Sequence, residues 1–168
     1  MKEIEAKILD IDVTDTMSRI LEAGAEKTFD GNVDVVFYDY PDDKLRSEGR
    51  RLRLRSFGDR VELTYKKNLS KETVKIAEEL QVNVSNFDET KQILEGIGLV
   101  PVYSYTKHRV SFCIKDACFE VDSIPGCPPF LEIEAVTEEK VFEWVKKLGF
   151  SAESALPWSG NEVIEYYS

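Results

Sequence analysis

The sequence predicts an α+β protein built on an eight-stranded antiparallel β-barrel, a tunnel with a charged lumen, with three amphipathic helices packed outside. Eight segments alternate between apolar and polar residues, which is the period of a strand with two unlike faces. Three other segments carry apolar residues at helical spacing. The polar strand faces carry both acids and bases, so their charges could neutralise one another across an enclosed space.

The alternation is clearest in residues 1–9, the first expected strand. Glu3, Glu5 and Lys7 project to one side of this strand, and Ile4 and Ala6 project to the other. Neighbouring glutamates on one face repel each other, whereas a divalent cation between them would turn the repulsion into coordination. The alternative is a half-exposed strand whose polar side faces water.

Seven later segments repeat the alternation. In the segment 51–55, Arg51, Arg53 and Arg55 share one strand face, where like charges repel, so we expect an anion opposite them. Arg51 is expected at the rim of the tunnel. Residues 41–43, 68–74 and 124–129 are expected to be loops. The expected strands after the first are residues 35–39, 51–55, 61–66, 79–84, 102–113, 117–122 and 130–134.

Three helices are expected, over residues 12–24, 86–98 and 137–149. Each begins at a residue that can cap a helix and reaches a glycine near its end. The tail, residues 152–168, is expected to hold a loop and one or two short helical turns. Trp158 in that loop either packs in the core or covers one mouth of the tunnel.

A coarse duplication runs through the chain. Each half opens with an acidic strand, Glu3-x-Glu5 or Glu79-x-Gln81. Each half then continues into a helix that ends at a glycine and into strands that carry paired bases. No linker separates the halves, so we expect one domain over residues 1–168.

Two architectures fit such strands. In a sandwich the apolar faces meet and the charges face water, whereas in a barrel the charges line a lumen. Composition alone favours the sandwich, but each helix needs an apolar sheet surface to cover, and the outside of a barrel provides one. A lumen of mixed charge is too costly to desolvate empty, so it should hold water, metal ions and an anion.

Composition excludes several function classes. The 22 basic and 32 acidic residues give a net charge of −10, which argues against binding to nucleic acid or to anionic membranes. No apolar run is long enough to span a bilayer, and no leader segment is evident, so we expect a soluble, cytoplasmic protein.

The three cysteines form no CxxC pair and indicate no zinc site. Cys113 and Cys118 flank an expected two-residue turn, Lys115-Asp116, and would face each other across a hairpin. In a reducing cytosol we expect both to be free thiols.

The ordered set Glu3-x-Glu5-x-Lys7, Leu52-Arg53-x-Arg55, Leu63-Thr64-Tyr65-Lys66, Lys107-x-Arg109, Asp122 and Phe130-Leu131-Glu132-x-Glu134 resembles the CYTH superfamily of triphosphate tunnel metalloenzymes, in particular its class IV adenylyl cyclase-like branch. The resemblance covers almost the whole chain. It implies a tunnel that binds a triphosphate, such as ATP or tripolyphosphate, with Mg²⁺ or Mn²⁺. Lys67, in place of a common glycine, and the absence of a lysine after Lys147 depart from the family pattern.

The resemblance also implies roles for individual residues. Those expected to hold metal are Glu3, Glu5, Asp122, Glu132 and Glu134. Those expected to bind phosphate are Lys7, Arg53, Arg55, Lys66, Lys107 and Arg109, and Glu79 matches a further tunnel acid. Those expected to be catalytic are Glu3, Glu5, Lys7, Arg53 and Lys66.

Three functions are compatible with such a site. A metal-dependent triphosphatase requires the fewest features of the site and is the function we expect. A class IV adenylate cyclase would also need a pocket that fixes adenine and ribose, and the sequence identifies none. A non-catalytic polyphosphate- or nucleotide-binding module is the third. The sequence leaves open the physiological substrate, the number of metal ions, the activating base and whether the chain forms a homodimer.

Overall fold

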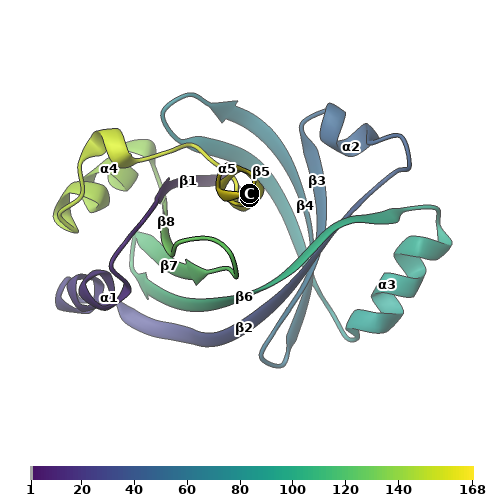
Figure 1. Ribbon diagram of the computed structural model, residues 1–168, viewed down its shortest axis with the longest axis horizontal. Helices are drawn as coiled ribbons and strands as arrows, with labels where there is room; N and C mark the ends of the chain where they lie inside the picture. The colour runs from purple at the N-terminus through teal and green to yellow at the C-terminus, as the bar shows by residue number, and fades with distance from the viewer. Residues whose placement is uncertain (1) are drawn as a thin grey trace.

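A computed structural model describes residues 2–168 of the chain. Eight antiparallel strands close into one barrel in the order β1-β5-β4-β3-β2-β6-β7-β8, with helices outside it, which confirms the predicted fold class (Figure 1). The strands are β1 (Lys2–Ile8), β2 (Glu26–Asp39), β3 (Arg50–Phe57), β4 (Arg60–Lys71), β5 (Lys75–Val84), β6 (Val100–Ile114), β7 (Ala117–Ser123) and β8 (Phe130–Ala135). The helices are α1 (Val13–Glu22), α2 (Lys44–Ser47), α3 (Phe87–Gly96), α4 (Glu138–Lys147) and α5 (Gly160–Tyr167).

Several strands are longer than predicted. β2 begins at Glu26, well before the expected residue 35, and β5 begins at Lys75. The loop expected at residues 68–74 is confirmed only for residues 72–74, because β4 continues to Lys71. A register shift between Asn68 and Ser70 interrupts the alternation there, which explains why the sequence pattern did not indicate a strand. Residue 1 of the first expected strand lies outside the described residues.

The apolar strand faces lie outside the barrel and are covered by helices. Ile4 and Ile133 are buried in one cluster with Ile20 of α1 and Trp144 of α4. Leu54 belongs to a second cluster, beneath α3. Figure 1 shows α1 and α4 on one side of the barrel and α3 on the opposite side. The strands therefore turn their charged faces inward, as the barrel alternative requires.

The three predicted helices begin where expected. Asp12, Asn86 and Thr137 each accept a hydrogen bond from the backbone N–H three residues further on. The apolar stripe predicted for the second helix is only partly correct, since Ile93 of α3 and Ile97 directly after it are 63% and 69% exposed.

The short helix α2 was not predicted. The buried Asp39 carboxylate at the end of β2 accepts hydrogen bonds from the backbone N–H groups of Tyr40, Leu45 and Arg46. One side chain thus fixes the loop that contains α2. Such a contact between a strand end and a later loop has no signature in local sequence periodicity.

The C-terminal segment is part of the barrel rather than an appendage. Leu156 exchanges two backbone hydrogen bonds with Lys7, at 2.9 and 2.8 Å. A capping box between Ser159 and Glu162 then starts α5, which lies over the barrel opening in Figure 1. Trp158 is partly buried against the cluster that contains Val163, and Ser159, Gly160 and Asn161 directly after it line the tunnel cavity.

The strand order carries the duplication noticed in the sequence. The first half of the chain contributes β1 to β4, and the second half contributes β5 to β8. When each strand is exchanged with its counterpart in the other half, β1 with β5, β2 with β6, β3 with β7 and β4 with β8, every strand keeps the same neighbours around the barrel. The paired bases do not follow this symmetry, because one pair lies on β3 and the other on β6. Among residues 2–168, the helices are too short or too polar to cross a membrane.

Candidate functional site

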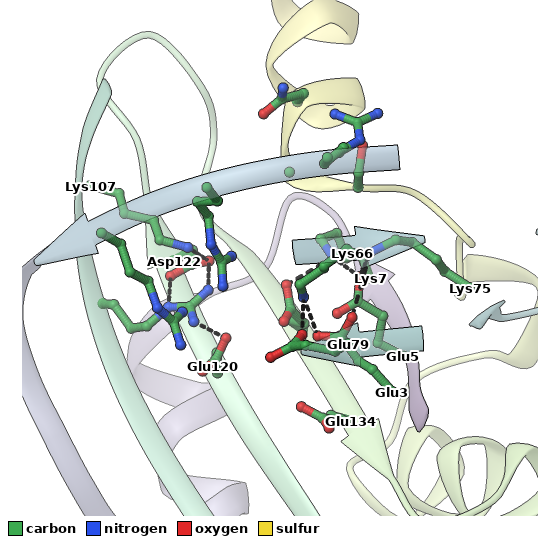
Figure 2. Close-up of a pocket in the computed structure, with 18 of the residues that line it drawn as sticks. Glu3, Glu5, Lys7, Lys66, Lys75, Glu79, Lys107, Glu120, Asp122 and Glu134 are labelled. Atoms are coloured by element: carbon green, nitrogen blue, oxygen red, sulfur yellow. Dashed lines mark hydrogen bonds and ion pairs between the residues drawn. The ribbon is translucent and has the colours of Figure 1, made fainter. Parts of the chain in front are cut away.

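The barrel encloses a cavity of about 250 Å³ that both termini of the chain help to line, through Glu3 and Asn161. Every residue that the sequence singled out for the site lies on its wall. The predicted residues brought together there are Glu3, Glu5, Lys7, Arg53, Arg55, Lys66, Glu79, Lys107, Arg109, Asp122, Glu132 and Glu134. Figure 2 shows the charged side chains in two groups, one around Asp122 and one around Lys7 and Lys66.

The first group centres on Asp122, which is fully buried. Its carboxylate accepts hydrogen bonds from Lys107 Nζ at 2.7 Å and from two nitrogens of Arg109 at 2.7 and 2.6 Å. Burial alone would raise the pKa of Asp122, but Arg109 and Lys107 hold it below its usual value. Burial and the neighbouring Arg109 lower the pKa of Lys107 to about 8. Arg109 also contacts Glu120.

The second group is built on Lys7, which is 1% exposed. Lys7 Nζ lies 3.0 Å from Glu5 and 2.8 Å from Glu132. Burial would lower the pKa of Lys7, but these two carboxylates raise it above its ordinary value. Burial likewise opposes ionisation of Glu132, yet Lys7 and Arg109 hold the pKa of Glu132 well below its usual range.

Three more ion pairs extend the charged wall. Lys66 bridges Glu3 and Glu79, at 2.5 and 2.7 Å. Arg55 binds Glu62 at 2.8 Å. Most of the expected phosphate-binding bases therefore already neutralise a carboxylate of the same lumen.

Arg53 differs from the other bases. Its Nε is buried without a hydrogen-bond partner, and burial together with the neighbouring Arg55 lowers its pKa. None of the ion pairs among residues 2–168 involves Arg53 or Arg51, the next arginine along the same strand face. Burying a positively charged hydrogen-bond donor without a partner costs free energy, so this part of the tunnel wall is suited to binding an anion.

Three carboxylates converge in a way that suits a divalent cation. One oxygen each of Glu120, Asp122 and Glu132 lie within 4.8 Å of one another. Hard cations such as Mg²⁺ prefer oxygen ligands, so this donor set fits them. Of the five acids predicted to hold metal, this cluster contains Asp122 and Glu132, whereas Glu3, Glu5 and Glu134 line other parts of the lumen.

Glu134 stands apart from the paired acids. Burial, with Glu3 and Glu132 nearby, raises the pKa of Glu134 to about 8. Burial raises the pKa of Glu120 to about 7, although Arg109 opposes the shift. The lumen thus contains two acids whose ionisation is less favourable than that of an ordinary glutamate.

Sequence reasoning missed several residues of the wall. The alternation of residues 117–122 places Glu120 on the same face as Asp122, but the family resemblance implies no role for it. Lys75, which binds Glu5 at 2.6 Å, was lost because the stretch before it was assigned to a loop. Tyr105 and Gln81 also line the cavity. Extending the alternation of residues 79–84 back by four positions would have placed Lys75 on the same face as Glu79.

His108 lies between Lys107 and Arg109 on β6 and therefore points away from the lumen. It is half exposed and lies 3.2 Å from Asp30 on the outer surface.

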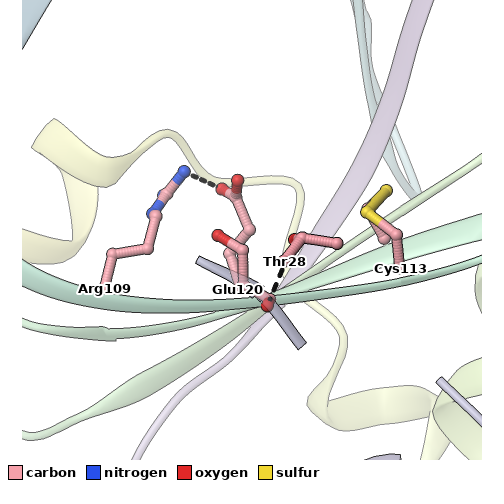
Figure 3. Close-up of a disulfide and its surroundings, with 6 residues drawn as sticks. Thr28, Arg109, Cys113 and Glu120 are labelled. Carbon is pink, nitrogen blue, oxygen red and sulfur yellow. Dashed lines mark hydrogen bonds and ion pairs between the residues drawn. A yellow bond between two sulfur atoms is a disulfide. The ribbon is translucent and has the colours of Figure 1, made fainter. Parts of the chain in front are cut away.

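The expectation of free thiols at Cys113 and Cys118 is wrong. The two residues are register partners across the hairpin of β6 and β7, with Cα atoms 4.2 Å apart, and they form a disulfide. Figure 3 shows the bond near Arg109 and Glu120, and Cys118 is also the register partner of Glu134 on β8. The disulfide therefore lies on the lumen face, beside the charged wall. Cys127 remains free.

A family model decides the relationship of this chain to known proteins. The model of the CYTH domain matches residues 1–164. The chain belongs to the CYTH family. A comparison with curated proteins finds no match.

Solved structures share the fold of this CYTH protein. A candidate adenylate cyclase from Vibrio parahaemolyticus superposes with a TM-score of 0.84 at 19% identity, over 97% of both chains. The PH1012 protein of Pyrococcus horikoshii gives 0.83 at 21% identity, over 96% of this chain and 98% of its own. HpAC1 from Hippeastrum, whose description reports a dominant triphosphatase activity, gives 0.73 at 16% identity, over 98% and 95%. At such identities the likeness shows the fold alone.

Proposed function

We propose that this CYTH protein is a divalent-metal-dependent triphosphatase that binds a triphosphate in its tunnel and hydrolyses it. The observation that carries the proposal is Arg53, whose buried Nε lacks a partner in a lumen where three carboxylates converge nearby. An anion opposite Arg53 and a cation between the carboxylates would satisfy both features at once. A polyphosphate with its metal ion supplies both.

The bases of the lumen would hold the phosphate chain. Arg53 and Arg51 are free to donate hydrogen bonds to phosphate oxygens, and a guanidinium can do so with two parallel bonds. Lys66 and Arg55 would exchange part of their present carboxylate contacts for phosphate contacts. Glu3 and Glu79 would then be released from Lys66, which makes further carboxylate oxygens available in the lumen.

Glu120, Asp122 and Glu132 would hold the metal ion, with Glu5 nearby through its shared contact with Lys7. A bound Mg²⁺ or Mn²⁺ supplies charge neutralisation and polarisation of the phosphoryl oxygens. Water then attacks the terminal phosphorus in line, the bridging P–O bond breaks, and the remaining phosphates leave as pyrophosphate or as an organic diphosphate. Lys7, Lys107 and Arg109, which line the same cavity, would stabilise the negative charge on the transferred group.

An adenylate cyclase is the second candidate, and it is supported by the fold shared with candidate cyclases. In that reaction the 3′-hydroxyl of ATP attacks the α-phosphorus, and pyrophosphate leaves. HpAC1 favours hydrolysis by analogy, since its description pairs the cyclase assignment with a dominant triphosphatase activity. A non-catalytic triphosphate-binding module would use the same bases without turnover.

Product analysis tests these functions. The protein is incubated with tripolyphosphate or ATP in the presence of Mg²⁺ or Mn²⁺, and products are separated by ion-exchange chromatography. Orthophosphate without cyclic AMP supports the triphosphatase. Cyclic AMP with pyrophosphate supports the cyclase, and tight binding without turnover supports the binding module. Absence of both binding and turnover overturns the site assignment.

A further inference from the structure

The disulfide between Cys113 and Cys118 lies at the end of the tunnel away from α5. Tyr105, near the start of β6, lies beside Gly160 of α5, whereas Cys113 is the second-last residue of the same strand. Cys113 follows Tyr105 by eight positions, which corresponds to roughly 26 Å along an extended strand. The bond therefore belongs to the mouth of the tunnel opposite α5.

A single step along the strands separates this bond from the carboxylates that suit a divalent cation. Ser111 pairs with Glu120 across β6 and β7, and the next pair on the same face is Cys113 with Cys118. Glu120 is one of the three acids whose carboxylate oxygens converge, and Figure 3 shows it on the same side of the sheet as Cys113. Cys118 also pairs with Glu134 of β8, so two acids of the cavity wall neighbour the bond.

The backbone already holds the two cysteines opposite each other. β6 and β7 pair residue by residue from Ile114 and Ala117, next to the turn, to His108 and Ser123. The bond therefore adds a local restraint, and breaking it leaves the barrel topology in place. Both cysteines are half-buried, so a reductant can reach them. Such accessibility is typical of a regulatory bond rather than of a bond on which the fold depends.

Breaking the bond changes the surroundings of Glu120. Sulfur atoms that are no longer bonded must separate to van der Waals contact, so the side chains of Cys113 and Cys118 then need more room on the lumen face. Glu120 and Glu134 border them on that face. Among residues 2–168, the ion pair with Arg109 is the only one that Glu120 makes. The extra volume of two thiols therefore acts on an acid that one ion pair holds in place.

We propose that Cys113 and Cys118 form a redox switch, in which the disulfide keeps Glu120 in the carboxylate cluster and reduction to two thiols weakens binding of the divalent cation. This regulation rests on the proposed function. A dithiol reductant supplies two electrons and two protons, the S–S bond breaks, two cysteine thiols form, and the reductant becomes a disulfide. The carboxylates converge in the structure that holds the bond, so the oxidised protein is the form suited to the metal.

Mn²⁺ binding by calorimetry tests the switch. The oxidised protein is compared with protein that has been reduced by a dithiol and then freed of the dithiol without air. Reduction should weaken Mn²⁺ binding at least about tenfold, the loss typical when the support of a metal ligand is removed. The double variant Cys113→Ser/Cys118→Ser should bind like the reduced protein and should not respond to the dithiol. Cys127→Ser is the matched control and should respond like the wild type, because Cys127 is not bonded. Equal or tighter binding after reduction overturns the switch.

A measurement without metal separates this outcome from failure of the proposed function. Arg109 contacts Glu120, and its Nε–H donates to Asp122, so exchange of this hydrogen with solvent reports on the order of the wall. Where the oxidised protein binds no Mn²⁺, the proposed function fails and the switch is judged by this exchange, followed by NMR. Faster exchange after reduction of the wild type, with no response in the double variant, supports the switch. Exchange that reduction leaves unchanged overturns it.

Discussion

Arg109 donates from Nε and Nη2 to the two carboxylate oxygens of Asp122, at 2.7 and 2.6 Å, inside the barrel, where both side chains are buried. Two parallel bonds of this kind fix both side chains in one geometry. Lys107 donates to the same carboxylate, so Asp122 is shared by two buried positive charges, of which Arg109 also contacts Glu120. The wall around β6 and β7 therefore depends on Asp122 before any ligand is bound.

Replacing Asp122 by Asn should lower the free energy of unfolding by about 3 to 5 kcal/mol, because buried Lys107 loses its carboxylate partner and buried Arg109 keeps only Glu120. Urea denaturation in the presence of a chelator measures the change. Asp42→Asn, in an exposed loop, is the control and should change stability by less than about 0.5 kcal/mol. An equal effect of the two substitutions would contradict the assigned role of Asp122.

Arg53→Ala should weaken tripolyphosphate binding at least about tenfold, since a guanidinium that has no protein partner is lost to the ligand. The stability of the ligand-free protein should not fall, because no ion pair is broken. Calorimetry and urea denaturation together test both statements. Arg60→Ala, an exposed arginine at the turn after β3, should leave the affinity unchanged. Retained affinity in Arg53→Ala would remove Arg53 from the site.

Glu120→Gln should raise the Mn²⁺ concentration needed for half-maximal activity about tenfold or more, since a cation held by three carboxylates loses one charged ligand. Titration of activity with Mn²⁺ measures the shift. Glu139→Gln, on the surface of α4, is the control. If the Mn²⁺ requirement stays the same, the metal does not lie between Glu120, Asp122 and Glu132.

The raised pKa of Glu134 predicts how stability depends on pH without metal. In the folded protein this carboxyl ionises near pH 8 because of burial and the surrounding acids, whereas an ordinary glutamate ionises near 4.5. Between these values the folded state holds a proton that the unfolded state has released. The contribution of Glu134 to the free energy of unfolding therefore falls as the pH rises from about 4.5 to 8.

Glu134→Gln removes this titration. The variant should gain on the order of 1 to 3 kcal/mol over the wild type at pH 8.5 and little at pH 5, as measured by urea denaturation with chelator present. Glu138→Gln, which changes an acid of the first turn of α4, should show no such pH-dependent gain. A gain of equal size at both pH values would contradict the shifted pKa.

The disulfide between Cys113 and Cys118 closes a short loop, with a sequence separation of five. Closing such a loop restricts the unfolded chain, so replacing both cysteines by serine should lower the free energy of unfolding by about 2 kcal/mol. Cys127→Ser should not have this effect, because Cys127 is not bonded. Under non-reducing denaturing conditions, an alkylating reagent should modify one cysteine of the wild-type protein. Modification of all three would show that the bond is absent.

Much of the fold could be predicted because period-two alternation is a local signal. A strand with one charged face, such as residues 51–55, reveals its two faces within five residues, and the helix caps at Asp12, Asn86 and Thr137 are equally local. The long β2 and β4 strands could not be delimited, because bulges near Lys27 and Asn68 interrupt their alternation.

The pairing of side chains within the candidate site was harder to predict than the set of side chains that face the lumen. The side chains could be assigned to the lumen from their strand face, but their partners depend on which strands are adjacent, and the strand order β1-β5-β4 is not encoded in local pattern. Lys66 and Glu3, 63 positions apart, meet only because β5 lies between their strands. The unpaired Arg53 could not be foreseen for the same reason. The prediction of free thiols rested on a reducing cytosol, whereas Cys113 and Cys118 are register partners across a hairpin, a geometry that allows the disulfide.

The backbone amide hydrogen of Lys7, which is hydrogen-bonded to Leu156, can report whether the C-terminal segment is attached to the barrel. Lys7 donates its N–H to Leu156, at a position of β1 that the pairing with β5 no longer covers. Exchange of this hydrogen with deuterated solvent therefore requires the tail to leave the barrel, whereas the strand around it stays paired with β8. Its exchange rate, followed by NMR with and without nucleotide, reads how often the segment bearing α5 detaches.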